Sequence, residues 1–308
     1  MLRPLVMGLL AVIAIPGGAS AQNCEPASVA VQILGSGGPQ LNPFRTSTSY
    51  LLWVGDRARA LVDIGGGAWS RFGQARAKVS DLSLLAVSHL HPDHISDLPA
   101  FLWLSHLERK EPLPIVGPSG NAAAPDFSTF LSRLFDENNG AFPVLGPTLG
   151  GKRRDIPPLS VASSVRLDVA VIDVAKGEPS TAFDRDGLVV TAQGIPHGNM
   201  PTLAYRVKVR DVSVVFSSDQ MGTDPKFVAF AKGANVLIMH LGVGAGVNYH
   251  PLHAAPAVVG RLAHEAGVGR LIVSHIGIFD LDAALADVRK AYTGPLTVGA
   301  DLQCTPVK

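Results

Sequence analysis

Short apolar runs alternate along the chain with Gly, Pro and Asp turns, and several runs are followed by stretches in which apolar residues recur every three or four positions. Compact runs rich in β-branched residues predict strands, and the second spacing predicts helices. In the first half, strands are predicted at 28–34, 48–54, 59–63, 82–87 and 113–116, and helices at 68–79, 95–107 and 126–136. Segment 137–158, with repeated Gly and Pro, is predicted to be a loop.

The second half repeats this arrangement. Its predicted strands are 165–174, 187–193, 203–209, 212–216, 236–239 and 270–273, and its predicted helices are about 253–266 and 281–292. Strands followed by helices in both halves favour an α/β fold in which two sheets pack face to face with helices outside, an αββα sandwich. The chain of 308 residues is 47% hydrophobic, which is enough for one large core. We therefore expect a single domain over 22–308.

Residues 1–21 have the pattern of a secretory signal peptide. Arg3 gives a short positive start, 5–15 is an apolar run, and Ala19-Ser20-Ala21 is a small-residue cleavage site. The apolar run is too short to cross a bilayer and stops at Pro16, so a membrane anchor is the weaker interpretation. The expected mature protein begins near Gln22, is periplasmic or secreted, and has no stable membrane anchor.

Charge and cysteine content add two expectations. Without Arg3 the chain has 25 basic and 25 acidic residues, so no net field favours nucleic acid, and nucleic acid is not an expected partner. The two cysteines, Cys24 and Cys304, stand at opposite ends of the mature chain. In an oxidising compartment such a pair more often forms a disulfide than a metal site.

The densest chemical signal directly follows the apolar run 82–87. Four residues able to bind a metal, His89, His91, Asp93 and His94, fall within six positions. Imidazole and carboxylate groups suit zinc or a similar divalent ion. The first two alternate along an extended loop and can face one ion, whereas the last two follow the Pro92 turn and can face a second. A polar turn that is merely rich in His is the alternative, which this spacing disfavours.

These residues match the His-x-His-x-Asp-His motif of the metallo-β-lactamase superfamily, and the resemblance extends over about 29–300. Three more segments resemble the branch that contains ribonuclease Z, arylsulfatases and cyclic-nucleotide phosphodiesterases. They are the glycine turn 34–39, the Arg/Ser stretch 44–49 and the strand 60–65, which ends in Asp-x-Gly. The resemblance implies the metallo-β-lactamase fold, with two mixed β-sheets packed face to face between outer helices.

The resemblance also implies a complete ligand set, because further candidates follow apolar strands where the family places them. One metal is held by His89, His91 and His197, the other by Asp93, His94 and His275, and Asp219 bridges the two. Two zinc ions per chain are expected, with manganese or iron as alternatives. Such a pair lowers the pKa of a bound water, so that hydroxide forms near neutral pH, and stabilises the oxyanion that follows its attack.

The candidate catalytic residues are Asp93, His253 and His240. In ribonuclease Z a His paired with a Glu protonates the leaving group, and His253 precedes the ligand His275 by the matching spacing. The family's Glu position is filled by His240, which is expected to orient His253 or to contact substrate. A pair of His residues lacks the carboxylate that would favour a protonated imidazole.

Two further departures bear on the substrate. The basic cluster 152–154 is no convincing counterpart of the basic arm of ribonuclease Z, and no basic residue follows His275 before Arg289. Together with the export signal and the neutral charge, they favour a secreted two-zinc hydrolase of a small phosphodiester or aryl sulfate ester. A lactone or β-lactam hydrolase and a non-catalytic periplasmic metal- or ligand-binding protein remain alternatives. Family members often pair, so a homodimer is also an open expectation.

Overall fold

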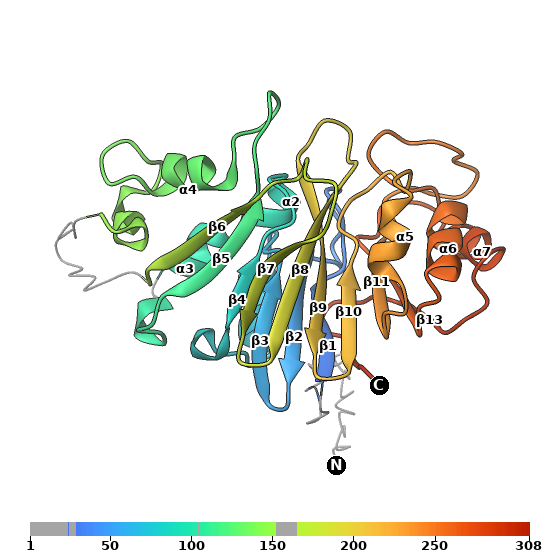
Figure 1. Cartoon of the computed structure of the whole chain (residues 1–308), viewed down its shortest axis with the longest axis horizontal. Coiled ribbons are helices and arrows are strands. Elements are labelled where there is room, and N and C mark those ends of the chain that lie inside the picture. Colours follow the sequence, from blue (N-terminus) through green and yellow to red (C-terminus); the bar gives the residue numbers. More distant parts are fainter. Residues whose placement is uncertain (1–23, 25–28, 104, 152–164) are drawn as a thin grey trace, which may run out of the picture.

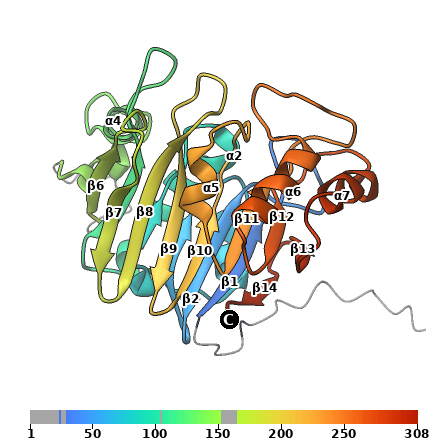
Figure 2. The ribbon, with the colours of Figure 1, turned by 45° about the vertical axis from the view of Figure 1, so that its right-hand side comes forward.

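The computed structural model describes residue 24 and residues 29–103, 105–151 and 165–308. The predicted signal segment 1–21 and the basic cluster 152–154 lie outside these residues. The described chain forms two sheets of seven strands each, which pack face to face with helices on both outer sides (Figures 1 and 2). The predicted fold, an αββα sandwich of two mixed sheets, is confirmed.

The first sheet is built from the N-terminal half and one C-terminal strand. Its order is β14-β1-β2-β3-β4-β5-β6. Neighbours are antiparallel from β14 to β3 and parallel from β3 to β6. The strands are β1 Val29–Gly35, β2 Ser49–Val54, β3 Arg57–Val62, β4 Leu84–Ala86, β5 Leu113–Pro118, β6 Leu167–Ile172 and β14 Cys304–Pro306.

The second sheet has a matching layout. Its order is β13-β12-β11-β10-β9-β8-β7, with antiparallel pairs from β7 to β10 and parallel pairs from β10 to β13. The strands are β7 Ser180–Arg185, β8 Leu188–Ile195, β9 Thr202–Val209, β10 Val212–Phe216, β11 Val236–His240, β12 Leu271–Ser274 and β13 Leu296–Val298. Each sheet therefore carries a parallel half whose strands all end at the same edge.

The core has three layers, one between the sheets and one on each outer face. Successive side chains of a strand point to opposite faces, so each strand contributes to two of these layers. In β1, Val29, Val31 and Ile33 enter the layer between the sheets, whereas Ala30 and Leu34 face the outer helices. The first outer layer lies under α1 Ala68–Gln74, α3 Leu98–Leu102 and α4 Phe127–Phe135. The second lies under α5 Lys226–Ala231, α6 Pro256–Glu265 and α7 Leu281–Arg289.

Several predicted elements differ in extent. The predicted helix 95–107 is divided into α2 Pro92–Ile95, α3 and the 3₁₀ turn η2 Ser105–Leu107, because Pro99 has no N–H to continue one helix. The predicted helix 68–79 ends at Gln74, since Arg76 takes a positive φ of 56°, and η1 Val79–Asp81 follows. Within the predicted loop 137–158, the described part contains a 3₁₀ helix, η3 Pro143–Leu149.

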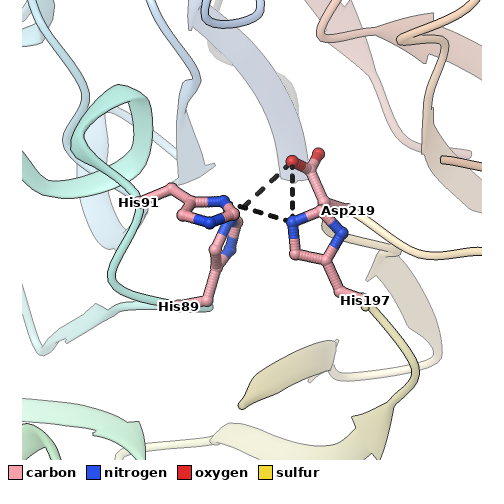
Figure 3. Close-up of side chains that lie close together, drawn as sticks. All are labelled: His89, His91, His197 and Asp219. Carbon is pink, nitrogen blue, oxygen red and sulfur yellow. Dashed lines mark hydrogen bonds and ion pairs between the residues drawn. The ribbon is translucent and has the colours of Figure 1, made fainter. Parts of the chain in front are cut away.

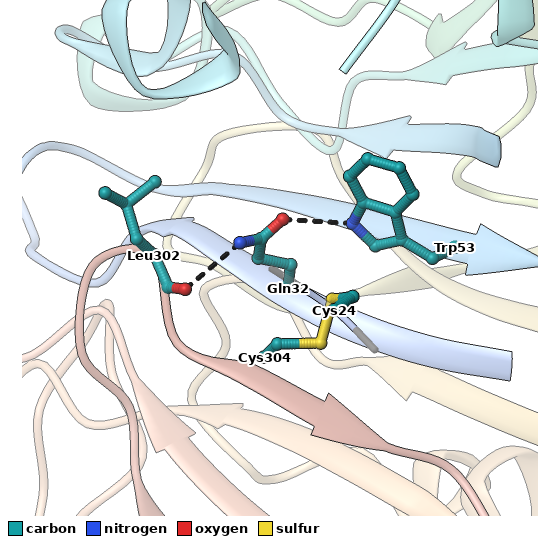
Figure 4. The surroundings of a disulfide bond; sticks show 5 residues. All are labelled: Cys24, Gln32, Trp53, Leu302 and Cys304. Carbon is teal, nitrogen blue, oxygen red and sulfur yellow. Dashed lines mark hydrogen bonds between the residues drawn. A yellow bond between two sulfur atoms is a disulfide. The ribbon is translucent and has the colours of Figure 1, made fainter. Parts of the chain in front are cut away.

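The predicted disulfide between Cys24 and Cys304 is present, with its Cα atoms 5.4 Å apart (Figure 4). Beside it, Trp53 Nε1 donates to Gln32 Oε1, and Gln32 Nε2 donates to the carbonyl of Leu302. The bond thus joins the N-terminal segment to edge strand β14, next to β1. No helix in the described part of the chain is long and apolar enough to cross a membrane.

Candidate metal centre

The strand ends bring the predicted ligands to one edge of the sandwich. His89 follows β4, His197 follows β8, Asp219 follows β10 and His275 follows β12. Because β8, β10 and β12 run in the same direction within their sheet, their carboxyl ends lie at the same edge. Polar residues placed after these strands therefore converge without any long loop.

The short helix α2 presents the remaining ligands. His91 is its N-cap, and Pro92 occupies the first turn, where a missing N–H costs nothing. The N–H of His94 donates to the carbonyl of His91 at 2.9 Å, so the two side chains are held on either side of one tight turn. Asp93 lies between them with its side chain 11% exposed, so one carboxylate of the site remains open to solvent.

The first ligand cluster contains His89, His91, His197 and Asp219, whose side chains point toward a common centre (Figure 3). His91 Nδ1 lies 3.0 Å from His89 Nε2 and 3.2 Å from His197 Nε2. Asp219 Oδ2 lies 3.6 Å from His197 Nε2 and 3.8 Å from His89 Nε2. Tetrahedral zinc with bonds of about 2.1 Å separates its ligand atoms by about 3.4 Å, so the spacing fits such an ion.

The second cluster shares Asp219. Its other members are His94, His240 and His275, with ligand atoms that all lie within 4.8 Å of one another. The sequence-predicted ligand Asp93 is also there, since its Oδ2 lies 3.2 Å from His275 Nε2 and 3.6 Å from His94 Nε2. The structure thus brings together all seven predicted ligands and adds His240 beside them.

Hydrogen bonds behind the ligands fix which ring nitrogen faces the centre. His94 Nδ1 donates to Asp63 Oδ2 at 2.8 Å, and His197 Nδ1 donates to the carbonyl of Leu252 at 2.7 Å. Ser88 donates to Asp63 through both its N–H and its hydroxyl, at 2.7 and 2.8 Å. Such outer partners orient metal-binding His residues and select their tautomers. Asp63, Ser88 and the Leu252 carbonyl were not assigned a role from sequence, although 60–65 was recognised as a family segment.

Several residues beside the ligand clusters have an unusual backbone conformation. Asp63, Ser218 and His275 take positive φ values of 57°, 53° and 52°, a region that residues other than Gly rarely adopt. Conformations of this kind cluster at functional sites, where the surrounding structure imposes them. The glycine turn near the N-terminus belongs to this packing, because a Cβ on Gly38 would lie 2.8 Å from Cε1 of His275.

Charge coupling within the cluster is strong. Burial alone would raise the pKa of Asp219, but His275 and His94 hold it well below its usual range. Burial would likewise lower the pKa of His94, yet the carboxylates of Asp219 and Asp63 raise it well above the ordinary value. By contrast, burial takes the pKa of His89 well below that value. A divalent cation would neutralise the buried carboxylates and replace the proton on His94.

One atom tests this fit directly. His94 Nε2 is fully buried and has no hydrogen-bond partner among the described residues, yet it lies 3.5 Å from Asp219 Oδ2 and 3.6 Å from Asp93 Oδ2. A buried polar atom without a partner is costly in a native protein unless something else binds it. Its surroundings are those of a metal ligand, and the His/Asp cluster is therefore suited to a divalent metal.

The candidate catalytic residues take different positions. His253 is 9% exposed, and its Nδ1 lies 3.9 Å from Asp219 Oδ1. His240 is 3% exposed, and its ring nitrogens contact Asp219 and Tyr50. No hydrogen bond joins it to His253 within the described structure. The expectation that His240 orients His253 or contacts substrate is therefore not supported, because Asp219 and Tyr50 already engage both of its ring nitrogens.

A sequence model of the beta-lactamase superfamily domain matches residues 60–276, a range that contains all seven predicted ligands. The chain belongs to the metallo-β-lactamase superfamily. The resemblance predicted from the His-x-His-x-Asp-His motif is confirmed, and with it membership in a superfamily of hydrolases.

Two similar curated relatives are both named ribonuclease Z. Ribonuclease Z from Mycobacterium sp. strain KMS is 30% identical over 261 residues, which cover 80% of this chain and 84% of that protein. Ribonuclease Z from Mycobacterium bovis BCG Pasteur is 27% identical over 290 residues, covering 88% and 96%.

Solved structures agree on the fold. Human tRNase Z, short form, has a TM-score of 0.68 at 18% identity and covers 91% of this chain and 99% of its own. A metallo-β-lactamase fold protein from Bacillus subtilis has a TM-score of 0.68 at 19% identity, covering 90% and 98%.

Two expectations from sequence are wrong in this light. A small phosphodiester or aryl sulfate ester as the substrate, and nucleic acid as an unlikely partner, both conflict with relatives that are ribonucleases. The expectation rested on the export signal and the missing basic segments as well as on net charge, and net charge is a poor test for nucleic acid. Net charge averages over the whole surface, whereas a metal centre can supply positive charge locally, where a phosphodiester would bind.

Proposed function

We propose that this protein is a metal-dependent phosphodiesterase that hydrolyses RNA. The observation that carries the proposal is the complete His/Asp constellation in a chain that is 30% identical to a ribonuclease Z over 80% of its length. The constellation provides hydrolytic chemistry at a phosphodiester without a protein nucleophile. The relatives are ribonucleases, which supports RNA as the polymer that is cleaved.

The donor set favours two divalent ions, with zinc preferred and Asp219 shared between them. When bound, such a pair stabilises developing negative charge on a phosphate and makes water acidic enough to be deprotonated near neutral pH. The chain's own contribution begins with Asp93. Although burial opposes it, the His275 hydrogen bond and nearby His charges lower the pKa of Asp93 to about 2. Its carboxylate therefore stays ionised and can bind a metal ion or accept a proton from water.

His253 is assigned to the leaving oxygen. Its Nδ1 faces Asp219 and has no hydrogen-bond partner among the described residues. Burial lowers the pKa of His253 to about 4, so the ring is neutral before substrate arrives. An anionic phosphate beside it would favour the protonated imidazole, and the pKa should rise when RNA binds. The proton would then be delivered from Nδ1 to the departing ribose oxygen.

A pocket beside His253 has room for part of the substrate. Its volume is about 490 Å³, and apolar groups of Met221, Val258 and Leu262 line it together with His250 and Tyr249. Tyr249 is 68% exposed, which leaves its ring free to stack on a base. Stacking on aromatic side chains is a usual way to hold unpaired RNA bases, and the volume is within the range of ordinary small-molecule sites.

The test is cleavage of matched substrates by the metal-reconstituted protein. RNA, the same sequence as DNA, and bis-nitrophenyl phosphate are compared with and without prior EDTA treatment. The proposal expects RNA to be cleaved with the highest kcat/KM, and cleavage to disappear with the metal and return on its addition. Metal-loaded protein that cleaves the chromogenic diester but leaves RNA intact would refute RNA as the substrate.

We also propose that the protein is exported. The disulfide between Cys24 and Cys304 supports an oxidising compartment, since such bonds rarely persist in a reducing cytosol. Fractionation followed by N-terminal sequencing tests this proposal. Mature protein that starts near Gln22 is the expected result, and full-length protein confined to the cytosol would contradict it.

A further inference from the structure

His240 occupies the position of the family's Glu but makes contacts of its own. It is the last residue of β11, and its Nδ1 lies 2.6 Å from Asp219 Oδ1. Its Nε2 lies 3.0 Å from the hydroxyl of Tyr50, a fully buried residue of β2 in the opposite sheet. The imidazole therefore connects the two sheets beside the bridging candidate Asp219.

The chemistry of the partners fixes the direction of both hydrogen bonds. An ionised carboxylate only accepts hydrogen bonds, so the proton of His240 must be on Nδ1 and point at Asp219. In a neutral imidazole the other nitrogen is then an acceptor, and the Tyr50 hydroxyl must donate to Nε2. Burial raises the pKa of Tyr50 well above its usual range, which agrees with a phenol that keeps its proton.

We infer that Tyr50 and His240 are positioning residues that hold the bridging carboxylate Asp219, and that His240 is not a metal ligand. The inference rests on the proposed metal centre. His240 binds Oδ1 of Asp219, which also lies 3.2 Å from His275 Nε2. Oδ2 lies 3.5 Å from His94 Nε2 and 3.6 Å from His197 Nε2. The hydrogen bonds from Tyr50 to His240 and from His240 to Asp219 thus link the opposite sheet to the carboxylate that both ligand clusters share.

The competing role for His240 is direct coordination of the second ion, because its ligand atoms also lie within 4.8 Å of the other members of that cluster. Its distance from Asp219 disfavours coordination. Two ligands of one tetrahedral ion are separated by about 3.4 Å, whereas 2.6 Å is a short hydrogen bond. Asp93 satisfies the ligand spacing instead, with 3.2 Å to His275 Nε2 and 3.6 Å to His94 Nε2.

The side chain at position 240 therefore decides whether Asp219 Oδ1 receives a hydrogen bond. A Glu there would place a second carboxylate against Asp219 Oδ1, and like charges at hydrogen-bond distance repel unless one is protonated. A His supplies a hydrogen-bond donor of the correct geometry and adds no charge. Asn offers a similar donor near Nδ1 but cannot reach Tyr50, and Leu offers neither contact. These three residues form a graded set of variants.

The first experiment uses protein reconstituted with cadmium-113 and labelled with nitrogen-15 at His. Scalar coupling to the metal is expected for His89, His91, His94, His197 and His275, and none for His240. The spectrum of His240 should show a neutral ring protonated at Nδ1, both with cadmium and in the metal-free protein. Coupling of His240 to cadmium, or a proton on Nε2, would overturn the inference. Failure of the protein to bind cadmium would instead refute the metal centre, while the tautomer is still measured in the metal-free protein.

The second experiment measures zinc affinity. His240→Leu should weaken binding by about 10–100-fold, the usual cost of losing an outer partner of a ligand. Tyr50→Phe should weaken zinc binding less, because His240 can still donate to Asp219. His240→Asn should also weaken it less, because the Asn amide can still donate to Asp219 although it does not reach Tyr50. Melting temperatures of the metal-free proteins distinguish positioning from folding, since only the metal-bound form should lose stability strongly. Equal zinc affinity for Asn and Leu at position 240, or wild-type affinity for both, would contradict the inference.

Discussion

At the scale of single residues, the site separates groups that bind metal from groups that support them. The ligands could be predicted because each stands at the end of an apolar strand and in a family motif. The supporting residues could not, since Tyr50 and Ser88 are ordinary polar residues whose roles appear only when distant strands pack together. His240 was found from sequence through its departure from the family, but its partners depend on the distance between the sheets.

Asp63 provides a test of these supporting contacts. It accepts the Nδ1 proton of His94 and two hydrogen bonds from Ser88. Asp63→Asn keeps the volume but removes the charge that holds the proton on Nδ1, so zinc affinity should fall by about 10–100-fold. Isothermal titration of the metal-free protein measures this, with Asp56→Asn on the exposed turn before β3 as a matched control. Equal affinities for both variants would show that Asp63 does not support the ligand.

The role of His253 leads to a prediction about leaving groups. General acid catalysis is typically worth about 10²–10⁴-fold, and more when the departing oxygen is basic. His253→Ala should therefore slow RNA cleavage by at least about 10²-fold and a nitrophenyl diester far less, with metal content unchanged. Rates on the two substrates together with elemental analysis check this. Loss of metal, or one common factor for both substrates, would assign His253 to ligation or support.

At the scale of elements, strands buried on both faces were the most predictable, because apolar and β-branched residues dominate β1, β10 and β11. The edge strands β7, β13 and β14 were missed, whereas edge strand β6 lies within the predicted strand 165–174. β7 buries only Phe183 completely among its six residues, and β14 is three residues long and ends in Pro306. Such edge strands form by hydrogen bonding to a neighbouring strand of the sheet. Their own composition and periodicity therefore do not predict them.

The disulfide that anchors β14 gives the prediction at this scale. It closes a loop of 280 residues, which in the chain-entropy model stabilises the fold by up to about 5 kcal/mol. The double variant Cys24→Ser, Cys304→Ser should melt at a clearly lower temperature but retain its zinc content, because the bond lies away from the ligands. Calorimetry with and without reductant measures the effect. An unchanged melting temperature would mean that β14 is held by its strand pairing alone.

At the scale of the whole molecule, the concentration of buried His residues makes stability depend on pH when metal is absent. Burial lowers the pKa of His240 and of His253 to about 4, compared with about 6.5 in an unfolded chain. Between these values the unfolded chain binds more protons, so the free energy of unfolding decreases as the pH falls. Burial also lowers the pKa of His89, His91 and His197, whereas the pKa of His94 is raised.

The metal-free protein should therefore lose stability as the pH falls from 6.5 toward 4, by about 3 kcal/mol for each fully shifted His. Chemical denaturation in EDTA at pH 7.5 and 5.5 measures the difference. Acidification should also expel bound metal, because the ligands must be deprotonated to bind it. A metal-free protein equally stable at both pH values would contradict the buried, neutral state assigned to these residues.

Whole-molecule properties were also where sequence reasoning failed. The balance of charges was correct, but it did not describe the surface that meets substrate, and the relatives named ribonuclease Z overturned the conclusion drawn from it. The fold class succeeded because it depends on the order of strands and helices. A homodimer remains a prediction.

The most direct test of the account is the rate of RNA cleavage as zinc is added stepwise to metal-free protein. Activity is expected to rise until about two equivalents are bound and then to stay constant. Asp219→Ala should bind less zinc and lose almost all cleavage, because one carboxylate serves both metal positions. RNA cleavage that persists in EDTA, or a fully zinc-loaded wild-type protein that leaves RNA intact, would contradict the account.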